Sequence, residues 1–298
     1  MNLRRIGIIL KGWFLVTAAL CIMASRIPAA PYRSELKVFL SPDRIPQGGL
    51  GLLRIKEMEF GVAPEVLWRG NIVTLVPDPE KGEWVGLIGV DLGADPGEYT
   101  LRVVEADRKR LLKVVVVSKD YGVRRLTLPK KMVELDPQTL ERVKKETRVM
   151  RRIWSAPPSE PLWRGGFVRP VPGKVVGPFG KRSILNGRPR SPHSGVDFRG
   201  ALGTPVRAAN HGRVVLTAEH FFSGRSVVID HGGGILSMYF HLRDITVGET
   251  DFVHKGEVIG HVGSTGRATG PHLHWGVRVG GARVDPLLLL KLGRELEE

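Results

Sequence analysis

A pair of histidines separated by one residue, His272-Leu273-His274, constrains this chain more than any other feature. In a β-strand successive side chains point to opposite faces, so the two imidazoles share a face. The same geometry applies to His193 and Asp197, which are four residues apart. With His241, these residues offer four imidazoles and one carboxylate, which are ligand types that zinc prefers. A fold for this chain therefore has to bring three separate segments to one place.

The number of candidate metal ligands helps to distinguish a structural from a catalytic zinc site. A structural zinc site uses four protein ligands, whereas a catalytic site uses three and keeps a position for water. Five candidates therefore favour a catalytic site, with imidazoles left over for proton transfer. All nine histidines of the chain lie between His193 and His274. A lone histidine in a strand is usually a hydrogen-bonded structural residue, which is our interpretation of His211, His220, His231, His254 and His261.

The segment from about Val171 to Leu290 resembles peptidase family M23, the zinc metallopeptidases of the lysostaphin and LytM type that cut peptide cross-links in bacterial cell walls. HxH is a weak signal by itself, but together with HxxxD and a middle histidine it is a strong one. The N-terminal half shows no comparable match. The matching pieces, in the family's order, are Phe179-Gly180-Lys181-Arg182, His193 to Phe198, Gly203-Thr204-Pro205-Val206, Tyr239-Phe240-His241-Leu242, and Gly263-Ser264-Thr265-Gly266 leading into His272-Leu273-His274-Trp275.

This resemblance implies roles for particular residues. It implies zinc ligation by His193, Asp197 and His274. It places His241 and His272 beside the metal-bound water as the catalytic pair, and which of the two is the general base stays open. Arg182 and Tyr239 are candidates for substrate contact because they lie next to matching motifs.

The function implied is that of an exported zinc-dependent endopeptidase that hydrolyses cross-links or stem peptides of bacterial peptidoglycan. The alternative from another class is a non-catalytic LytM-like regulator that binds and activates a cell-wall amidase. That alternative predicts missing ligands, whereas all five positions are filled here. A third hypothesis is a metallopeptidase that acts on a protein.

The chain is strongly basic, with a formal charge of +15 and a pI near 10.3. A basic surface is either a solvated surface or one that attracts an anionic polymer. No helix-turn-helix, RNP or zinc-finger spacing is present, so we expect no nucleic-acid partner. An anionic cell wall or membrane surface fits the other features better. The oligomeric state is not predicted.

Residues 1–30 have the pattern of an export signal. A basic start, Asn2-Leu3-Arg4-Arg5, precedes an apolar run from Ile6 to Ala24 that Lys11 interrupts. The run could be cleaved off or could stay as an inner-membrane anchor, since about 20 apolar residues span a bilayer. Both alternatives place the remainder in the periplasm or cell envelope. Cys21, the single cysteine, lies in this run, so the remainder can form no disulfide.

Residues 35–120 read as about seven short strands separated by turns such as Pro46-Gln47-Gly48-Gly49. This spacing is typical of a small β-sandwich, Ig-like in outline. We expect Trp68 and Trp84 to lie in its core. The segment has no histidine, so its expected role is spacing, docking or covering.

Residues 135–165 are predicted to form a helix and a proline-rich linker. Asp136 as N-cap, with Pro137 at the first helical position, marks the helix start. Leu140, Val143, Thr147, Met150 and Trp154 would share one face. Residues 166–293 return to strands and glycine turns. The expected fold is therefore all-β, with an antiparallel two-sheet LytM-type domain, an N-terminal Ig-like sandwich and a connecting helix.

Overall fold

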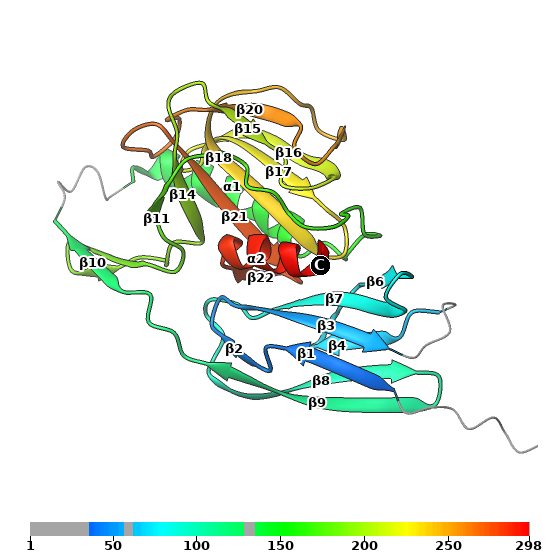
Figure 1. The fold of residues 1–298 in the computed structure, drawn as a ribbon. Coiled ribbons are helices and arrows are strands. Elements are labelled where there is room, and N and C mark those ends of the chain that lie inside the picture. The colour runs from blue at the N-terminus through cyan, green and yellow to red at the C-terminus, as the bar shows by residue number, and fades with distance from the viewer. Residues whose placement is uncertain (1–35, 57–61, 128–134, 298) are drawn as a thin grey trace, which may run out of the picture. The chain divides into compact units, whose positions relative to one another are not determined.

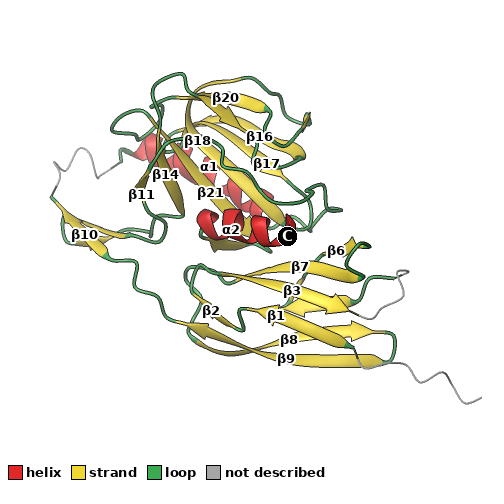
Figure 2. Cartoon of the chain, viewed as in Figure 1, coloured by secondary structure: helices red, strands yellow, loops and turns green. Residues whose placement is uncertain are grey.

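The computed structural model describes residues 36–56, 62–127 and 135–297. It confirms the expected class, since strands dominate and two helices accompany them (Figures 1 and 2). Leu36–Glu298 cluster as one compact unit. The signal or anchor expected at residues 1–30 lies outside the described residues. Within the described ranges, no helix has the length and apolar character needed to cross a membrane.

In its described residues, the N-terminal part is a β-sandwich of nine strands, β1 to β9, compared with about seven expected. Its interior is a hydrophobic cluster to which both sheets contribute, including Leu53, Val66 and Leu101. One sheet has the order β1 (Lys37–Ser41), β3 (Leu50–Lys56), β7 (Glu83–Gly89) and β6 (Leu75–Asp78). The other has the order β2 (Arg44–Pro46), β9 (Arg108–Val117), β8 (Gly97–Glu105), β4 (Glu65–Trp68) and β5 (Asn71–Ile72).

Both tryptophans of the sandwich lie in its core, as predicted. Trp68 is 5% exposed and Trp84 is 8% exposed. The indole Nε1 of Trp68 donates to the carbonyl oxygen of Gly89 at 2.9 Å, so this buried polar group is satisfied.

Helix α1 (Pro137–Trp154) begins where the sequence predicts. The Asp136 carboxylate accepts a hydrogen bond from the backbone N–H of Thr139 at 2.9 Å, which caps the helix start. Met150 is buried in a cluster with Leu216, Val228 and Met238 of the sheet. The C-terminal half of the predicted apolar face therefore packs on strands, whereas Leu140 at its start is 42% exposed.

The C-terminal part is built on an antiparallel sheet. The sheet order is β11 (Val175–Gly177), β14 (Gly195–Arg199), β21 (His272–Val279), β18 (Ile235–Ile245), β17 (Gly224–Asp230), β16 (Gly212–His220) and β19 (Phe252–Val253), with β15 (Pro205–Arg207), β20 (Val258–Val262) and β22 (Ala282–Val284) attached. Strand β18 pairs with β17 and β21, and its C-terminal portion pairs with β20, which in turn pairs with β15. Helix α2 (Pro286–Glu297) follows β22.

A second, three-stranded sheet lies beside this one. It consists of β10 (Val123–Leu126), β12 (Arg182–Leu185) and β13 (Arg188–Pro189). Strand β10 follows the sandwich in the chain and pairs in parallel with β12. The segment that follows the sandwich in the chain therefore contributes one strand to this three-stranded sheet.

The sandwich and the C-terminal part share one hydrophobic cluster. Leu50 and Leu87 of the sandwich belong to the same buried cluster as Leu289 of α2. The guanidinium of Arg283 also contacts the Asp91 carboxylate, with Nη2–Oδ1 at 2.6 Å and Nε–Oδ2 at 3.0 Å. The hydrophobic core therefore continues from one part into the other.

His231 is a fully buried structural residue, as predicted. Its Nδ1 donates to the carbonyl oxygen of His211 at 2.7 Å. Its Nε2 lies 2.7 Å from the Ser237 hydroxyl oxygen, which lies 3.0 Å from the hydroxyl of Tyr239. The neutral ring satisfies both contacts, because one nitrogen donates and the other accepts.

This burial predicts a loss of stability in acid. Burial lowers the pKa of His231 from its ordinary 6.5 to about 4, so the unfolded chain takes up the proton first as the pH falls. The contribution is present in full above pH 6.5 and is lost between pH 6.5 and 4, by about 3 kcal/mol. Urea unfolding of the wild type and of His231→Gln, measured across this window, isolates the effect of one ring. The expectation is wrong if both proteins show the same dependence on pH.

Candidate active site

Strand register brings the expected ligands together. Asp197 in β14 lies directly opposite His274 in β21, and His193 precedes β14. His193 Nε2 is 3.0 Å from both Asp197 Oδ1 and His274 Nδ1. His274 Nδ1 is 2.9 Å from Asp197 Oδ1. Three potential ligand atoms, from residues up to 81 positions apart, thus converge on one point.

The hydrogen bonding of His193 shows what these atoms can hold. Its Nδ1 lies 2.9 Å from the Pro178 carbonyl oxygen, which can only accept. The neutral ring therefore carries its proton on Nδ1 and presents the Nε2 lone pair to the carboxylate. Two acceptors at 3.0 Å need a cation or a proton between them. Around a tetrahedral zinc ion, N/O ligands lie about 3.3 Å apart, so the donor set fits zinc.

The burial and closeness of these three side chains also shift their pKa values. Burial would raise the pKa of the Asp197 carboxyl, but hydrogen bonds from His193 and His274 hold that pKa well below its usual range. Burial disfavours the charged His193 ring, yet the hydrogen bond and charge of Asp197 outweigh it and raise the pKa of His193. Burial lowers the pKa of His274. Asp197 is thus held as the anion that a metal ligand must be.

His241 and His272 lie beside this cluster. Their ring centroids are 4.8 Å apart, and His272 Nε2 is 4.0 Å from Asp197 Oδ1. His241 Nδ1 donates to the Thr265 carbonyl oxygen and His272 Nδ1 to that of Gly270, each at 2.8 Å. In both rings Nε2 keeps the free lone pair. Burial lowers the pKa of His241 to about 4, so this imidazole is neutral near pH 7.

The backbone at His241 is strained. Its φ of 64° lies in the left-handed region, which costs about 1–3 kcal/mol for a residue with a side chain. The N–H of His241 donates to the Ser223 carbonyl oxygen at 2.8 Å, and the register of β18 against β20 shifts just beyond it. This irregularity interrupts the alternation of the strand and turns His241 towards His272 and His274.

The histidine cluster lies in a groove of about 530 Å³. Its walls come from the β10–β12–β13 sheet, from Phe222 after β16, and from the loop before β21. Its lining residues are Arg124, Ser183, Leu185, Arg190, Ser191, Pro192, His193, Ser194, Asp197, Phe222, His241, Arg267, Ala268, Thr269, His272 and His274.

The two residues expected to contact substrate lie elsewhere. Tyr239 is fully buried, and its hydroxyl accepts from the Ala209 N–H at 2.8 Å. It faces the core because side chains alternate along β18, and it does not line the groove. Ser183 and Leu185 of β12 line the groove and Arg182 does not, because Arg182 is on the opposite face of that strand. None of the five histidines interpreted as structural lines the groove.

Sequence reasoning missed the role of Gly177. This residue in β11 lies opposite Asp197, so a side chain here would share the carboxylate's face. A Cβ at this position would lie 2.1 Å from Asp197 Oδ2. Only the three-dimensional pairing of β11 with β14 reveals this contact, because the two residues are 20 positions apart.

We expect Gly177→Ala to displace the Asp197 carboxylate and weaken zinc binding about 10- to 100-fold, with a parallel loss of activity. Competition with a chromophoric chelator measures the affinity. Gly270→Ala is the matched control, since its Cβ meets no atom within 4 Å. Equal zinc affinity for the two variants would show that Asp197 tolerates the shift.

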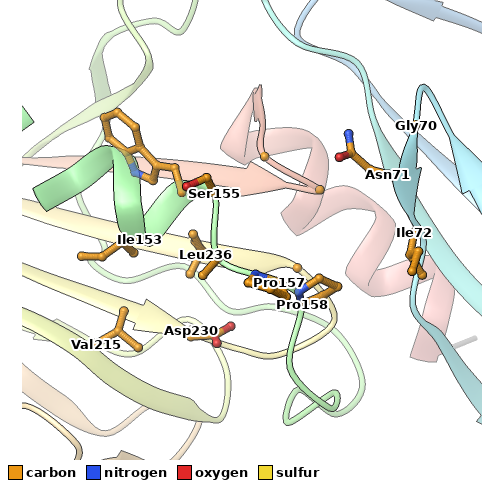
Figure 3. A pocket seen from close by; sticks show the side chains of 15 residues that line it. Gly70, Asn71, Ile72, Ile153, Ser155, Pro157, Pro158, Val215, Asp230 and Leu236 are labelled. Atoms are coloured by element: carbon orange, nitrogen blue, oxygen red, sulfur yellow. The ribbon is translucent and has the colours of Figure 1, made fainter. Parts of the chain in front are cut away.

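A second cavity, of about 430 Å³, lies at the C-terminal end of α1 (Figure 3). Ile153, Pro157, Pro158 and Leu236 give it an apolar lining, with Asn71 and Ile72 of the sandwich on the other side. Among the described residues of its lining, none is a histidine and Asp230 is the one carboxylate.

Comparison with known proteins places this geometry in a family. The profile of Peptidase family M23 matches residues 191–286. A DD-carboxypeptidase/endopeptidase Mpg from Neisseria meningitidis is 40% identical over 126 residues, which are 42% of this chain and 29% of the relative. The peptidoglycan DD-endopeptidase ShyA from Vibrio cholerae is 43% identical over 97 residues, 33% of this chain and 23% of the relative. The chain thus spans less than a third of either relative.

The similarity to a solved structure extends further along the chain. A crystal structure of a candidate M23 peptidase from Pseudomonas aeruginosa matches with a TM-score of 0.66 and 33% sequence identity. The match covers 82% of this chain and 94% of that one, well beyond residues 191–286. The chain therefore belongs to peptidase family M23.

Proposed function

We propose that this protein is an exported zinc-dependent endopeptidase that hydrolyses peptide bonds in bacterial peptidoglycan. The observation that carries the proposal is the convergence of His193, Asp197 and His274 within about 3 Å of one another, with two further imidazoles in the same groove. The relatives named as peptidoglycan DD-endopeptidase and DD-carboxypeptidase/endopeptidase support the substrate.

The residues of the groove have different roles in the proposed reaction. A zinc ion held by His193, Asp197 and His274 would supply a Lewis acid that polarises the scissile carbonyl and acidifies water. His241 and His272 each offer a free Nε2, because Nδ1 is committed to a backbone carbonyl. One Nε2 can take the proton of the attacking water. The other can hydrogen-bond to the developing oxyanion or return a proton to the leaving amine.

The alternative function is that of a non-catalytic LytM-like regulator. Such a protein has no use for a complete ligand set or for two further imidazoles beside it. All five polar positions are filled here and lie in one groove. The five side chains together favour an enzyme.

Incubation of the zinc-loaded full chain with isolated peptidoglycan tests the proposal. We expect new muropeptides whose masses identify the bond cut, and a loss of products when a chelator is added. A parallel reaction with a denatured protein distinguishes a general protease. Absence of released muropeptides from a fully zinc-loaded preparation would refute hydrolysis of peptidoglycan.

Export is proposed from the basic start and apolar run of residues 1–30. A reporter enzyme fused after residue 35, active only outside the cytoplasm, should gain activity in a bacterial host. A matched fusion in which Arg4 and Arg5 are replaced by glutamate is expected to lose most of it, because the basic start directs insertion. Activity confined to a reporter that works in the cytoplasm would contradict export.

A further inference from the structure

Three arginines line the same groove as the histidine cluster: Arg124, Arg190 and Arg267. They come from three places in the chain. Arg124 lies in β10, Arg190 directly follows β13, and Arg267 is in the loop between β20 and β21. Asp197 is the one acidic side chain among the described residues of the lining, and it is committed to His193 and His274.

Two of the three guanidinium groups make a contact that leaves donors free, and the third arginine is held through its backbone. Arg124 donates from Nε to the Ser183 hydroxyl at 2.8 Å, across the parallel pairing of β10 with β12. The Arg267 guanidinium lies 4.2 Å above the ring of Phe222. The backbone N–H of Arg190 donates to the Ser183 carbonyl oxygen at 2.9 Å. The guanidinium groups of Arg124 and Arg267, which are fixed in this way, lose little further freedom when they bind a ligand.

These positive charges lack negative partners. In the described part of the chain, none of the three guanidinium groups forms an ion pair with a carboxylate. Burial, and then the nearby charge of Arg190, lower the pKa of Arg267. Like charges that line one groove favour an anion between them, because the anion replaces repulsion by charge-assisted hydrogen bonds.

We propose that Arg124, Arg190 and Arg267 form an anion site that binds a carboxylate of the substrate peptide next to the scissile bond. The inference rests on the proposed peptidase function and specifies its substrate. A guanidinium fork matches a carboxylate in two parallel hydrogen bonds, which gives orientation as well as affinity. The preferred substrate is therefore a peptide with a free carboxylate, and conversion to the carboxamide weakens it.

Arg124 lies in the N-terminal half of the chain, so this half also contributes to the choice of substrate. Arg124 lies well outside residues 191–286, the range that matches the family profile. Strand β10 brings it to the groove through its pairing with β12. Strand β10 thus helps to select the substrate and also connects the sandwich to the C-terminal part.

Equilibrium binding separates this proposal from catalysis. The binding partner is the zinc-loaded full chain carrying His241→Asn, whose side chain tolerates positive φ and whose turnover is expected to be slower by about two to four orders of magnitude. The probe is a stem pentapeptide with one internal and one C-terminal carboxylate, in four forms: both free, either one amidated, and both amidated. Titration calorimetry is expected to show binding of the best form about 10- to 100-fold tighter than of the doubly amidated form. The form with one amide that loses affinity identifies which carboxylate the site holds.

The variants Arg124→Gln and Arg267→Gln should bind all four forms with nearly equal affinity. Arg125→Gln and Arg182→Gln are the matched controls, because these neighbours do not line the groove and should keep the preference. Equal binding of the four peptides by the unmodified groove, or loss of the preference in the controls as well, overturns the proposal. Muropeptide release by the wild type without any carboxylate preference would leave the peptidase function standing and refute the anion site alone.

Discussion

Replacement of His274 by alanine is expected to abolish both zinc binding and activity. His274 Nδ1 is one of three atoms that meet within about 3 Å, and two remaining ligands hold zinc weakly. Zinc content after dialysis should fall from about one ion per chain to near zero. Elemental analysis of the purified variant measures this, alongside release of muropeptides.

His254→Ala is the matched control, since His254 contacts the rings of His211 and Phe252 and does not line the groove. This control should keep its zinc and its activity. Full zinc content in His274→Ala would show that His274 is not a ligand. Activity in a preparation without bound metal would refute the metal-dependent mechanism itself.

Replacement of His272 by alanine, or of His241 by asparagine, is expected to leave zinc bound and to reduce activity by about two to four orders of magnitude. His272 Nε2 lies 4.0 Å from Asp197 Oδ1, outside the triad of close atoms, and its Nδ1 is bonded to Gly270. Neither ring belongs to the group of potential ligands. The measurement is zinc content together with kcat on a peptide substrate.

The rival arrangement makes opposite predictions for these variants. If both histidines of the HxH pair bound zinc with His193 and Asp197, the site would be a closed four-ligand site and inert. His272→Ala and His274→Ala would then lose zinc equally, and His241→Asn would change nothing. That combined result would require the cluster to be interpreted as structural.

The residues that interact within one element were predictable from the sequence. The period of two places His272 and His274 on one face of a strand, and the start of α1 follows from Asp136 and Pro137. In both cases the determining interactions lie within a few residues along the chain, so the sequence is enough to identify them.

The tertiary structure decided which atoms meet. Asp197 reaches His274 because β14 pairs with β21 in one register, and a shift by one residue would place the carboxylate on the other face. The left-handed backbone at His241 turns that ring towards the site, whereas neighbouring Tyr239 stays in the core. Arg124 enters the groove only through the parallel pairing of β10 with β12. Side-chain alternation is a property of a single strand, but the register between strands depends on the packing of the whole core.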